Sequence, residues 1–480
     1  MNVAICADVG STYTKVAVVD LGGAGLVATA AVPTTVGSDV LRGLDAAVAA
    51  ATDGLPVGDA PWYVCSSAGG GLRLAVVGYE QLVTAQAGRR VGLSAGANVV
   101  HVAAGRLDAA GLAAVRAARP DVLLLVGGTD GGDAETLTHN AARLARARWR
   151  VPVVLAGNAE VRDELVSMLV SARVPVTVAE NVLPRIGALA PAGARAAIRE
   201  VFLRHVIGGK RLSRGPRFPR LVRAATPDAV LTGVELLADT LGGDLAVVDV
   251  GGATTDVYSV LTPDERESGP GREVAGSLWR ARTVEGDLGV RWSALGVVRA
   301  AVEERLLDAA DAEVLAVAAQ RRADDPAFLP VGGAQRAADT RLAALAATVA
   351  LRRHARGAAT GERAGRDLRD VRLLVGSGGV LRHAGSADAA GVLTGVLTDH
   401  AGGWPLPRAA RPVVDVDYVL AAAGLLAAGH PVAARALCDR LRARGARPAL
   451  AARSSGGSVR AGRRGWRDTP GGGDDSSGPG

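Results

Sequence analysis

The chain has 480 residues, 49% of them hydrophobic and only 3% aromatic, so it is long enough for two or more domains with cores of valine, leucine and alanine. Its net charge of +7 is misleading, because residues 440–467 contain nine arginines and no acid, and residues 468–480 add three aspartates. The tail thus holds six of the seven net positive charges, and a near-neutral body argues against a general nucleic-acid-binding surface.

The cysteines and the hydrophobic segments favour a cytoplasmic protein. Cys6, Cys65 and Cys438 have neither metal-site nor redox-site spacing, and nothing indicates a disulfide framework. The N-terminus begins with a strand pattern and has no basic leader. The uncharged run at 418–429 is too short to cross a bilayer. We therefore expect a cytoplasmic protein with no membrane segment.

Two distant segments follow the same plan. Residues 3–19 and 246–258 each consist of an apolar strand, the triplet Asp-Val-Gly, a small hydroxyl-rich turn and a second apolar strand. A glycine turn exposes backbone N–H groups and lets a phosphate come close. A carboxylate at the strand end can hold Mg²⁺ through water. Two such hairpins facing each other are predicted to hold a nucleoside triphosphate from both sides.

The first hairpin is followed by a mixed region and then by a compact α/β unit. We expect a strand at 26–36, a helix at 40–52 and a strand at 62–66 that runs into the turn Gly69–Gly71. Residues 88–104 are turn-rich. Strands at 122–126, 152–156 and 174–178 alternate with helices at 134–148 and 160–172, which predicts a parallel β-α-β-α-β unit.

The loop that follows the first strand of this unit is a candidate cleft or partner site. Ligands of such sheets bind beyond the carboxyl ends of the strands. The candidate residues there are Gly128, Thr129, Asp130 and Asp133. A tight turn leading into a capped helix is the alternative interpretation.

The remaining expected elements lead up to the second hairpin and form the second half of the chain. We expect a helix at 194–206, an Arg- and Pro-rich loop at 213–226, and a helix at 228–241 that Asp228 caps. After the second hairpin come a polar loop at 262–276 and a glycine-containing segment at 283–291. Further predicted elements are helices at 297–322 and 334–357, strands at 373–375 and 413–416, and a helical region at 418–444.

Lysine usage singles out one position in the first hairpin. Only two of the 55 basic residues are lysines, Lys15 and Lys210. A lysine inside the first turn indicates a site that takes a slim ammonium but not a guanidinium fork. Chance placement is the alternative.

The order of these parts resembles the superfamily of actin, sugar kinases and heat-shock-chaperone ATPases. That resemblance implies an α/β, two-lobed actin-like ATPase fold with duplicated ribonuclease-H-like lobes and, here, an inserted Rossmann-like β-α-β-α-β unit. The implied domains are an N-terminal lobe over 1–230 with the insertion at about 75–210, a C-terminal lobe over 231–445 and a disordered tail over 446–480. The implied nucleotide-binding residues are Gly10, Ser11, Thr12, Thr14 and Lys15 of the first phosphate loop, Gly251, Gly252, Thr254 and Thr255 of the second, and Gly376, Ser377, Gly378 and Gly379 of an adenosine loop.

A closer resemblance covers most of residues 1–440. The segments 8–15, 65–68, 127–132, 249–256 and 285–289 are similar to the glutamate mutase accessory proteins of the MutL type. That resemblance implies an ATP-dependent reactivating factor for an adenosylcobalamin-dependent mutase. No Asp-x-His-x-x-Gly cobalamin motif occurs in the sequence, so no tightly bound cobalamin is expected.

The implied chemistry is hydrolysis of Mg-ATP. Asp8 and Asp249 are expected to hold Mg²⁺ through water, and Asp249 to orient or deprotonate the attacking water. Asp256, Glu285 and Asp287 are further candidates for the cleft or a partner site, with a structural turn as the alternative for the last two. A small-molecule kinase and a nucleotide-switched scaffold without significant hydrolysis remain alternative functions. The Arg-rich tail leaves contact with RNA or an acidic partner open.

Overall fold

The computed structural model describes most of the chain. The described residues are 1–23, 25–68, 72–80, 84–95, 97–207, 212–262, 280–356 and 366–446. The predictions made for the turn Gly69–Gly71, for Lys210, for most of the loop at 262–276 and for the tail beyond residue 446 lie outside them.

The first sheet contains the first predicted hairpin. Its strand order is β10-β4-β1-β2-β3. Strands β1 (Val3–Val9), β2 (Tyr13–Asp20) and β3 (Gly25–Pro33) are antiparallel neighbours, whereas β4 (Trp62–Ser66) and β10 (Val222–Ala225) run parallel to β1. Every residue of β1 is buried, as expected for an apolar central strand.

The second sheet repeats the plan of the first. Its order is β13-β12-β11-β14-β15. Strands β11 (Leu245–Val250), β12 (Thr255–Val260) and β13 (Arg280–Glu285) are antiparallel, and β14 (Leu373–Ser377) and β15 (Arg411–Val414) run parallel to β11. Two sheets with equal order and equal strand directions confirm the predicted duplicated lobes.

The third sheet is the inserted Rossmann-like unit. It is entirely parallel, with the order β6-β5-β7-β8-β9. The predicted strands are confirmed as β7 (Val122–Leu125), β8 (Val153–Leu155) and β9 (Val176–Val178). Two further strands, β5 (Arg73–Gly78) and β6 (Asn98–Ala104), enlarge the unit beyond the prediction.

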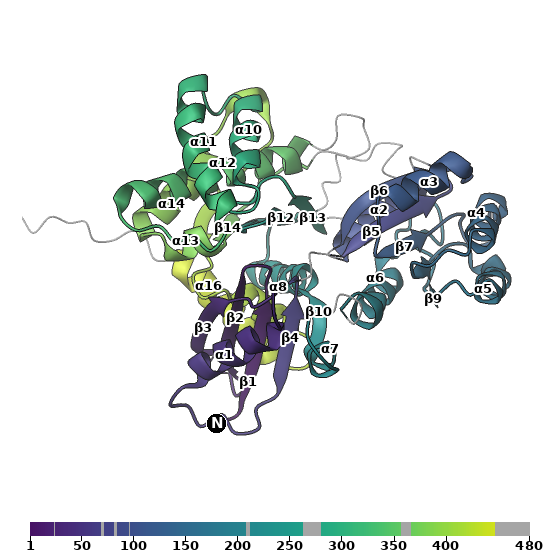
Figure 1. Ribbon diagram of the computed structural model, residues 1–480, viewed down its shortest axis with the longest axis horizontal. Coiled ribbons are helices and arrows are strands. Elements are labelled where there is room, and N and C mark those ends of the chain that lie inside the picture. Colours follow the sequence, from purple (N-terminus) through teal and green to yellow (C-terminus); the bar gives the residue numbers. More distant parts are fainter. Residues whose placement is uncertain are drawn as a thin grey trace, which may run out of the picture. The chain divides into compact units, whose positions relative to one another are not determined.

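Helices cover these sheets (Figure 1). Around the first sheet and the inserted sheet lie α1 (Val40–Thr52), α2 (Thr84–Ser94), α3 (Ala109–Ala117), α4 (Glu135–Arg146), α5 (Arg162–Ser171), α6 (Pro191–Val201) and α7 (Arg217–Leu221). One face of the second sheet packs against α10 (Ala294–Glu303), α11 (Ala309–Asp324), α12 (Gly333–Arg356), α13 (Gly379–His383) and α14 (Ser386–Leu397).

Three helices share one core with the inner faces of both lobe sheets. They are α8 (Thr226–Leu241), α15 (Val419–Leu426) and α16 (Pro431–Ala446). This core contains Ala4 and Cys6 of β1 as well as Val247 of β11 and Val375 of β14. The two hairpins are therefore anchored in the same buried layer.

Several local predictions were wrong. Residues 88–104 form most of α2 and all of β6, and the expected loop at 213–226 contains α7 and β10. Helix α8 begins at Thr226, so Asp228 lies within its first turn, where it accepts a hydrogen bond from Arg199 Nε at 2.5 Å. The single helix expected at 297–322 is two helices, α10 and α11.

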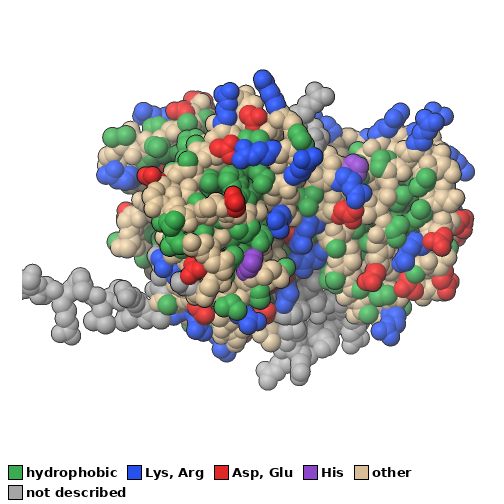
Figure 2. All heavy atoms as spheres, turned by 90° about the horizontal axis from the view of Figure 1, so that it is seen from below, with side chains coloured by type: hydrophobic (Ala, Val, Ile, Leu, Met, Phe, Trp, Pro, Cys, Tyr) green, Lys and Arg blue, Asp and Glu red, His purple; other side chains and the backbone are tan. Residues whose placement is uncertain are grey.

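The charges of the body are mixed. On the face seen in Figure 2, basic and acidic side chains are interspersed, as expected for a body with almost no net charge. No helix among the described residues is long and apolar enough to cross a bilayer.

Candidate functional site

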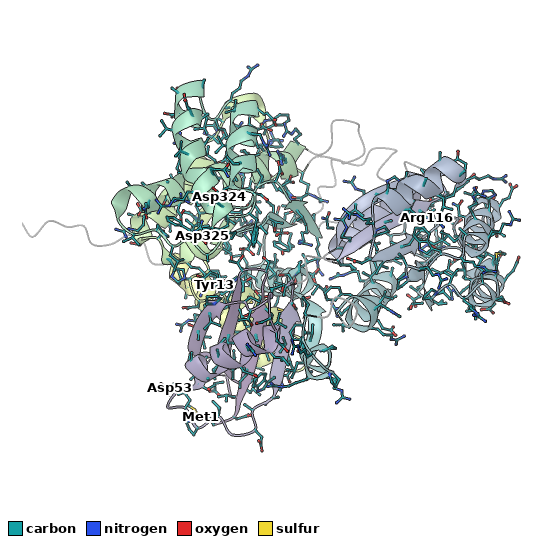
Figure 3. The ribbon with its side chains drawn as sticks, viewed as in Figure 1. Met1, Tyr13, Asp53, Arg116, Asp324 and Asp325 are labelled. Carbon is teal, nitrogen blue, oxygen red and sulfur yellow. The ribbon has the colours of Figure 1, made fainter. Side chains whose placement is uncertain are left out.

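The turns of the two predicted phosphate loops are closed in the same way. The Gly10 N–H donates to the Tyr13 carbonyl at 3.1 Å, and the Gly251 N–H donates to the Thr254 carbonyl at 2.9 Å. A Cβ atom at either glycine would lie 2.8 Å from the same carbonyl oxygen. Both turns therefore require glycine. Figure 3 shows where the first turn lies: Tyr13 is at the opposite end of the first sheet from Met1 and Asp53.

The structure brings these two turns together. The Thr12 hydroxyl oxygen lies 3.0 Å from the position that a Cβ of Gly252 would occupy. This hydroxyl is buried and has no hydrogen-bond partner in the described structure. A buried polar group without a partner is rare and calls for an explanation such as an absent ligand. Thr12 and Gly252 thus form a close junction between the lobes with one unused donor.

Asp8 is the most enclosed charged group of the first loop. Its side chain is 3% exposed, and Lys15 Nζ lies 3.6 Å from its Oδ2. The Thr226 hydroxyl donates to Oδ1, and Cys65 Sγ lies 3.6 Å from the same oxygen. Burial is the main cause of a strongly raised pKa at Cys65, so this thiol stays protonated and is not a nucleophile.

Lys15 also contacts the aromatic ring of Tyr418, a residue of the C-terminal half of the sequence. Its Nζ lies 3.5 Å from the centre of the Tyr418 ring. Burial, and then the charges of Asp8 and Asp249, raise the pKa of the Tyr418 hydroxyl well above its usual range. The hydroxyl is therefore protonated, and the ring is neutral beneath the ammonium.

Asp249 occupies in the second hairpin the place that Asp8 has in the first. Its neighbours in register are Asp256 on β12 and Ser377 on β14. Burial is the largest cause of its raised pKa, Asp256 and Asp8 add to the rise, and Lys15 and a hydrogen bond with Ser377 oppose it. A carboxylate with a raised pKa is a better base for a water molecule.

The two hairpins differ at one corresponding position. Asp8 faces Lys15 across the first hairpin, whereas Asp249 faces Asp256 across the second. Asp256 is neutralised by Arg282, whose Nε and Nη2 donate to Oδ1 at 3.0 and 2.6 Å. The first hairpin therefore has a cation at this position near its turn, whereas the second has a carboxylate that is already paired with Arg282.

The threonines and serine of the loops have different environments. Thr254 donates to Asp256 Oδ2 at 3.0 Å, while the fully buried Thr255 donates to the Leu288 carbonyl at 2.6 Å. Thr14 is also fully buried and shares a hydrogen bond with Thr34 at 3.0 Å. Ser11 is exposed at the tip of the first turn. In this structure Thr14 and Thr255 hold backbone and neighbouring segments in place.

The segment after β13 supports the second turn. The N–H groups of Val290 and Arg291 donate to the carbonyls of Gly251 and Gly252 at 3.0 and 2.9 Å. The carboxylates of Glu285 and Asp287 accept hydrogen bonds from Arg353 at 3.0 and 2.7 Å. In this structure both acids therefore tie the segment to α12.

The loop after β14 lies against the second hairpin. Gly378 has a φ of +110°, and a Cβ there would lie 2.1 Å from the Val250 carbonyl oxygen. A Cβ at Gly379 would lie in open space, whereas a Cβ at Gly376 would meet the side chains of Leu381 and Leu393. This close approach places Ser377 beside Asp249.

A buried carboxylate joins this loop to α15. The Asp415 N–H donates to the Gly376 carbonyl at 2.9 Å, and the Asp415 side chain accepts from the N–H groups of Val419 and Leu420 at 2.9 and 3.3 Å. The side chain is 1% exposed, and burial raises its pKa to about 6 in spite of these bonds.

The raised pKa of Asp415 predicts a pH-dependent stability. Folding favours the protonated acid, so its contribution is complete below the ordinary value of 3.8 and is lost as the pH rises through about 6. The loss amounts to about 3 kcal/mol. We expect the free energy of unfolding of the wild type to fall relative to that of Asp415→Asn between about pH 4 and pH 7, measured by denaturant titration. A pH-independent difference would show that Asp415 keeps an ordinary pKa.

The candidate residues of the inserted unit make their hydrogen bonds at the carboxyl edge of the third sheet. Asp130 Oδ1 accepts from the Ala159 N–H and from Asn181 Nδ2, both at 2.9 Å. A Cβ at Gly128 would lie 2.0 Å from the Asp133 carbonyl oxygen, and the Thr129 carbonyl accepts from the Gly132 N–H at 3.0 Å. These contacts fix the loop to the ends of the neighbouring strands, as the tight-turn interpretation expects.

The residues present fit a hydrated cation better than a directly coordinated one. No three His, Cys, Asp or Glu side chains converge on a metal position in the described part of the chain. Mg²⁺ usually keeps several waters and is held by one or two carboxylates together with substrate phosphates, and Asp8 and Asp249 are the candidates for that role. Both interact electrostatically with Lys15. Their role as magnesium ligands stays a prediction.

Sequence reasoning missed two residues of the site. Thr226 and Tyr418 lie more than 200 residues from the first hairpin in the sequence, and each follows a parallel strand of a lobe sheet. The sequence placed Tyr418 only at the start of the helical region expected at 418–444.

Comparisons with known proteins identify the family. Among solved structures, the chain is similar to a nucleotide-free structure of acetone carboxylase (TM-score 0.39, 16% identity, 89% of this chain and 70% of that one) and to the ATP-dependent caprolactamase from Pseudomonas jessenii (0.35, 15%, 88% and 70%). At these TM-scores the likeness says nothing about activity. The chain is 34% identical over 453 residues to Protein MutL of Clostridium tetanomorphum, covering 90% of this chain and 97% of that protein. The family model for the MutL protein matches residues 4–441, and the chain therefore belongs to the MutL family.

Proposed function

We propose that this chain binds and hydrolyses Mg-ATP in the cytoplasm as a reactivating accessory factor for an adenosylcobalamin-dependent mutase such as glutamate mutase. The observation that carries the nucleotide part is the junction of the two glycine turns, where the unpartnered Thr12 hydroxyl faces Gly252. Membership of the MutL family supports the partnership with mutase subunits.

The roles of the first loop follow from its donors and its cation. Gly10, Ser11 and Thr12 would donate backbone N–H and hydroxyl groups to phosphate oxygens, and Lys15 would neutralise phosphate charge. Asp8 would hold Mg²⁺ through water, and the cation would spread the negative charge that develops on the phosphates. The Thr226 hydroxyl keeps the Asp8 carboxylate oriented.

The second loop would supply the base. Asp249 has a raised pKa and lies beside Ser377, so it would accept a proton from water or orient the attacking molecule. Gly251, Gly252 and Thr254 would face the γ-phosphate, and the glycines of residues 376–379 would border the adenosine. Catalysis of this kind depends on positioning and charge stabilisation.

Hydrolysis would act on the partner through the lobes. Loss of the γ-phosphate removes a ligand that both turns contact, and the lobes can then separate. Such a movement performs work on a mutase only if the mutase binds the ATP and ADP states with different affinity. The proposed outcome is release of damaged cobalamin from the mutase, with no tightly bound cobalamin in this chain.

The test measures phosphate release from Mg-ATP by the purified protein, alone and with an adenosylcobalamin-dependent glutamate mutase. We expect slow release alone, faster release with the mutase, and a loss of both in Asp249→Ala. An unchanged rate would contradict the partnership. Acceptor-dependent ADP formation would indicate a small-molecule kinase, and tight binding with negligible turnover a nucleotide-switched scaffold.

A further inference from the structure

Lys15 of the first hairpin lies over the aromatic ring of Tyr418, the residue that precedes α15. Its Nζ lies 3.5 Å from the Tyr418 ring centre and 3.6 Å from Asp8 Oδ2, and its side chain is 20% exposed. A cation over a ring face is attracted to the electrons of the ring, most strongly when it is shielded from water. The ammonium is thus held between a carboxylate and a ring.

The backbone of Tyr418 is unusual. It has a φ of 56° and a ψ of 46°, the left-handed conformation that a bulky residue seldom adopts. The Tyr418 N–H donates to the Asp415 carbonyl at 3.2 Å, and the Asp415 side chain caps the next two residues, Val419 and Leu420. A strained residue that its surroundings fix so firmly is a candidate for a functional role.

The second cation near the ring is anchored elsewhere. Arg382 lies 5.4 Å from the Tyr418 ring centre, and its Nε donates to the Val416 carbonyl at 3.0 Å. Arg382 therefore braces the turn that carries Tyr418, while Lys15 is the cation that the turn presents to Asp8.

We propose that Tyr418 is a positioning residue that holds the Lys15 ammonium against Asp8 and thereby sets the first phosphate loop before a nucleotide arrives. The Tyr418 turn follows β15, so the ring also connects the second lobe to the first loop. The ring contact explains why a lysine occurs in a chain with only two lysines among 55 basic residues. A compact ammonium can lie on the ring and remain next to the carboxylate, whereas a guanidinium would require a planar fork.

The contact can be tested without a nucleotide because the chain has so few lysines. Lysine labelled with ¹³C at the ε carbon gives two signals, from Lys15 and Lys210, and Lys210→Arg identifies them. We expect the Lys15 ε-CH₂ protons at unusually high field from the ring current in the wild type and in Tyr418→Phe. In Tyr418→Leu they should return to the ordinary position. A Lys15 signal that is the same in all three proteins would overturn the proposal.

A second measurement tests what the positioning does and rests on the proposed ATP binding. Tyr418→Leu should bind Mg-ATP about 3- to 30-fold more weakly. Tyr418→Phe keeps the ring and loses only the hydroxyl that bonds to Asp8, so its affinity should fall less than that of Tyr418→Leu. Tyr63→Phe is the matched control, since the Tyr63 hydroxyl bonds to His430 at 2.7 Å and not to a loop residue. Equal affinity of all variants would refute the role in nucleotide binding. A wild type that binds no ATP would refute the proposed function, and the lysine signals would still decide the ring contact.

Discussion

The Asp249→Asn variant is expected to bind Mg-ATP almost as tightly as the wild type and to hydrolyse it about 100- to 10,000-fold more slowly. Asparagine keeps the size of the side chain and can still accept the hydrogen bond from Ser377. It cannot accept a proton from water. Binding measured by equilibrium dialysis and single-turnover phosphate release separate the two effects.

Asp45→Asn provides the matched control for this prediction. Asp45 lies on α1, is exposed and pairs with Arg217 at 2.8 Å, so removing its charge should leave the rate unchanged. The raised pKa of Asp249 adds a second expectation. The wild-type rate should rise with pH through a midpoint above that of an ordinary aspartate, and this dependence should be missing from Asp249→Asn. A variant with the wild-type rate would exclude Asp249 as the base.

The sequence predicted best what is determined locally. Each hairpin consists of two apolar strands joined by a turn that needs glycine, and all of these signals lie within about 15 adjacent residues. The structure closes both turns as expected at Gly10 and Gly251. The family was also identifiable from such short segments, and the family model confirms it.

The missed parts depend on contacts between distant segments. Residues 217–225 contain arginines and a proline, which indicate a loop, yet α7 and β10 form because β4 offers a parallel partner for Val222–Ala225. Thr226 reaches Asp8 because β10 and β1 run parallel and end at the same edge of the first sheet. Tyr418 follows β15 of the second sheet and reaches Lys15 from the other lobe. No pattern within one segment reveals such meetings.

The structure also shows which partners the threonines of the second loop bond to, which the sequence alone cannot show. Thr254 and Thr255 are identical side chains in the same turn, but strand alternation sends them in opposite directions. Thr254 bonds to Asp256, and Thr255 bonds to the Leu288 carbonyl. Their chemistry was predictable from the sequence, whereas their partners required the fold.

Two glycines let α8 and α15 approach each other closely in the core shared by the lobes. A Cβ at Gly424 would lie 1.8 Å from the Ala229 carbonyl oxygen, and a Cβ at Gly233 would lie 2.1 Å from the Leu420 carbonyl oxygen. In both cases the obstacle is backbone, which cannot rotate away as a side chain can. A methyl group at either position must push the helices apart.

Gly424→Ala is therefore expected to lower the free energy of unfolding by about 3 kcal/mol or more, at the upper end of the usual effect of overpacking. Because α15 begins next to Tyr418, the displaced helix should also weaken Mg-ATP binding. Gly395→Ala on α14 is the matched control: its Cβ would meet nothing within 4 Å, so alanine should stabilise the helix by about 0.5 to 1 kcal/mol. Denaturant titration of both variants measures the difference. We expect the two changes in the free energy of unfolding to have opposite signs. In α14 alanine lowers the backbone entropy that is lost on folding, whereas in α15 its methyl group collides with the backbone of α8. If both variants were stabilised, the lobes would tolerate a wider helix spacing than the structure has.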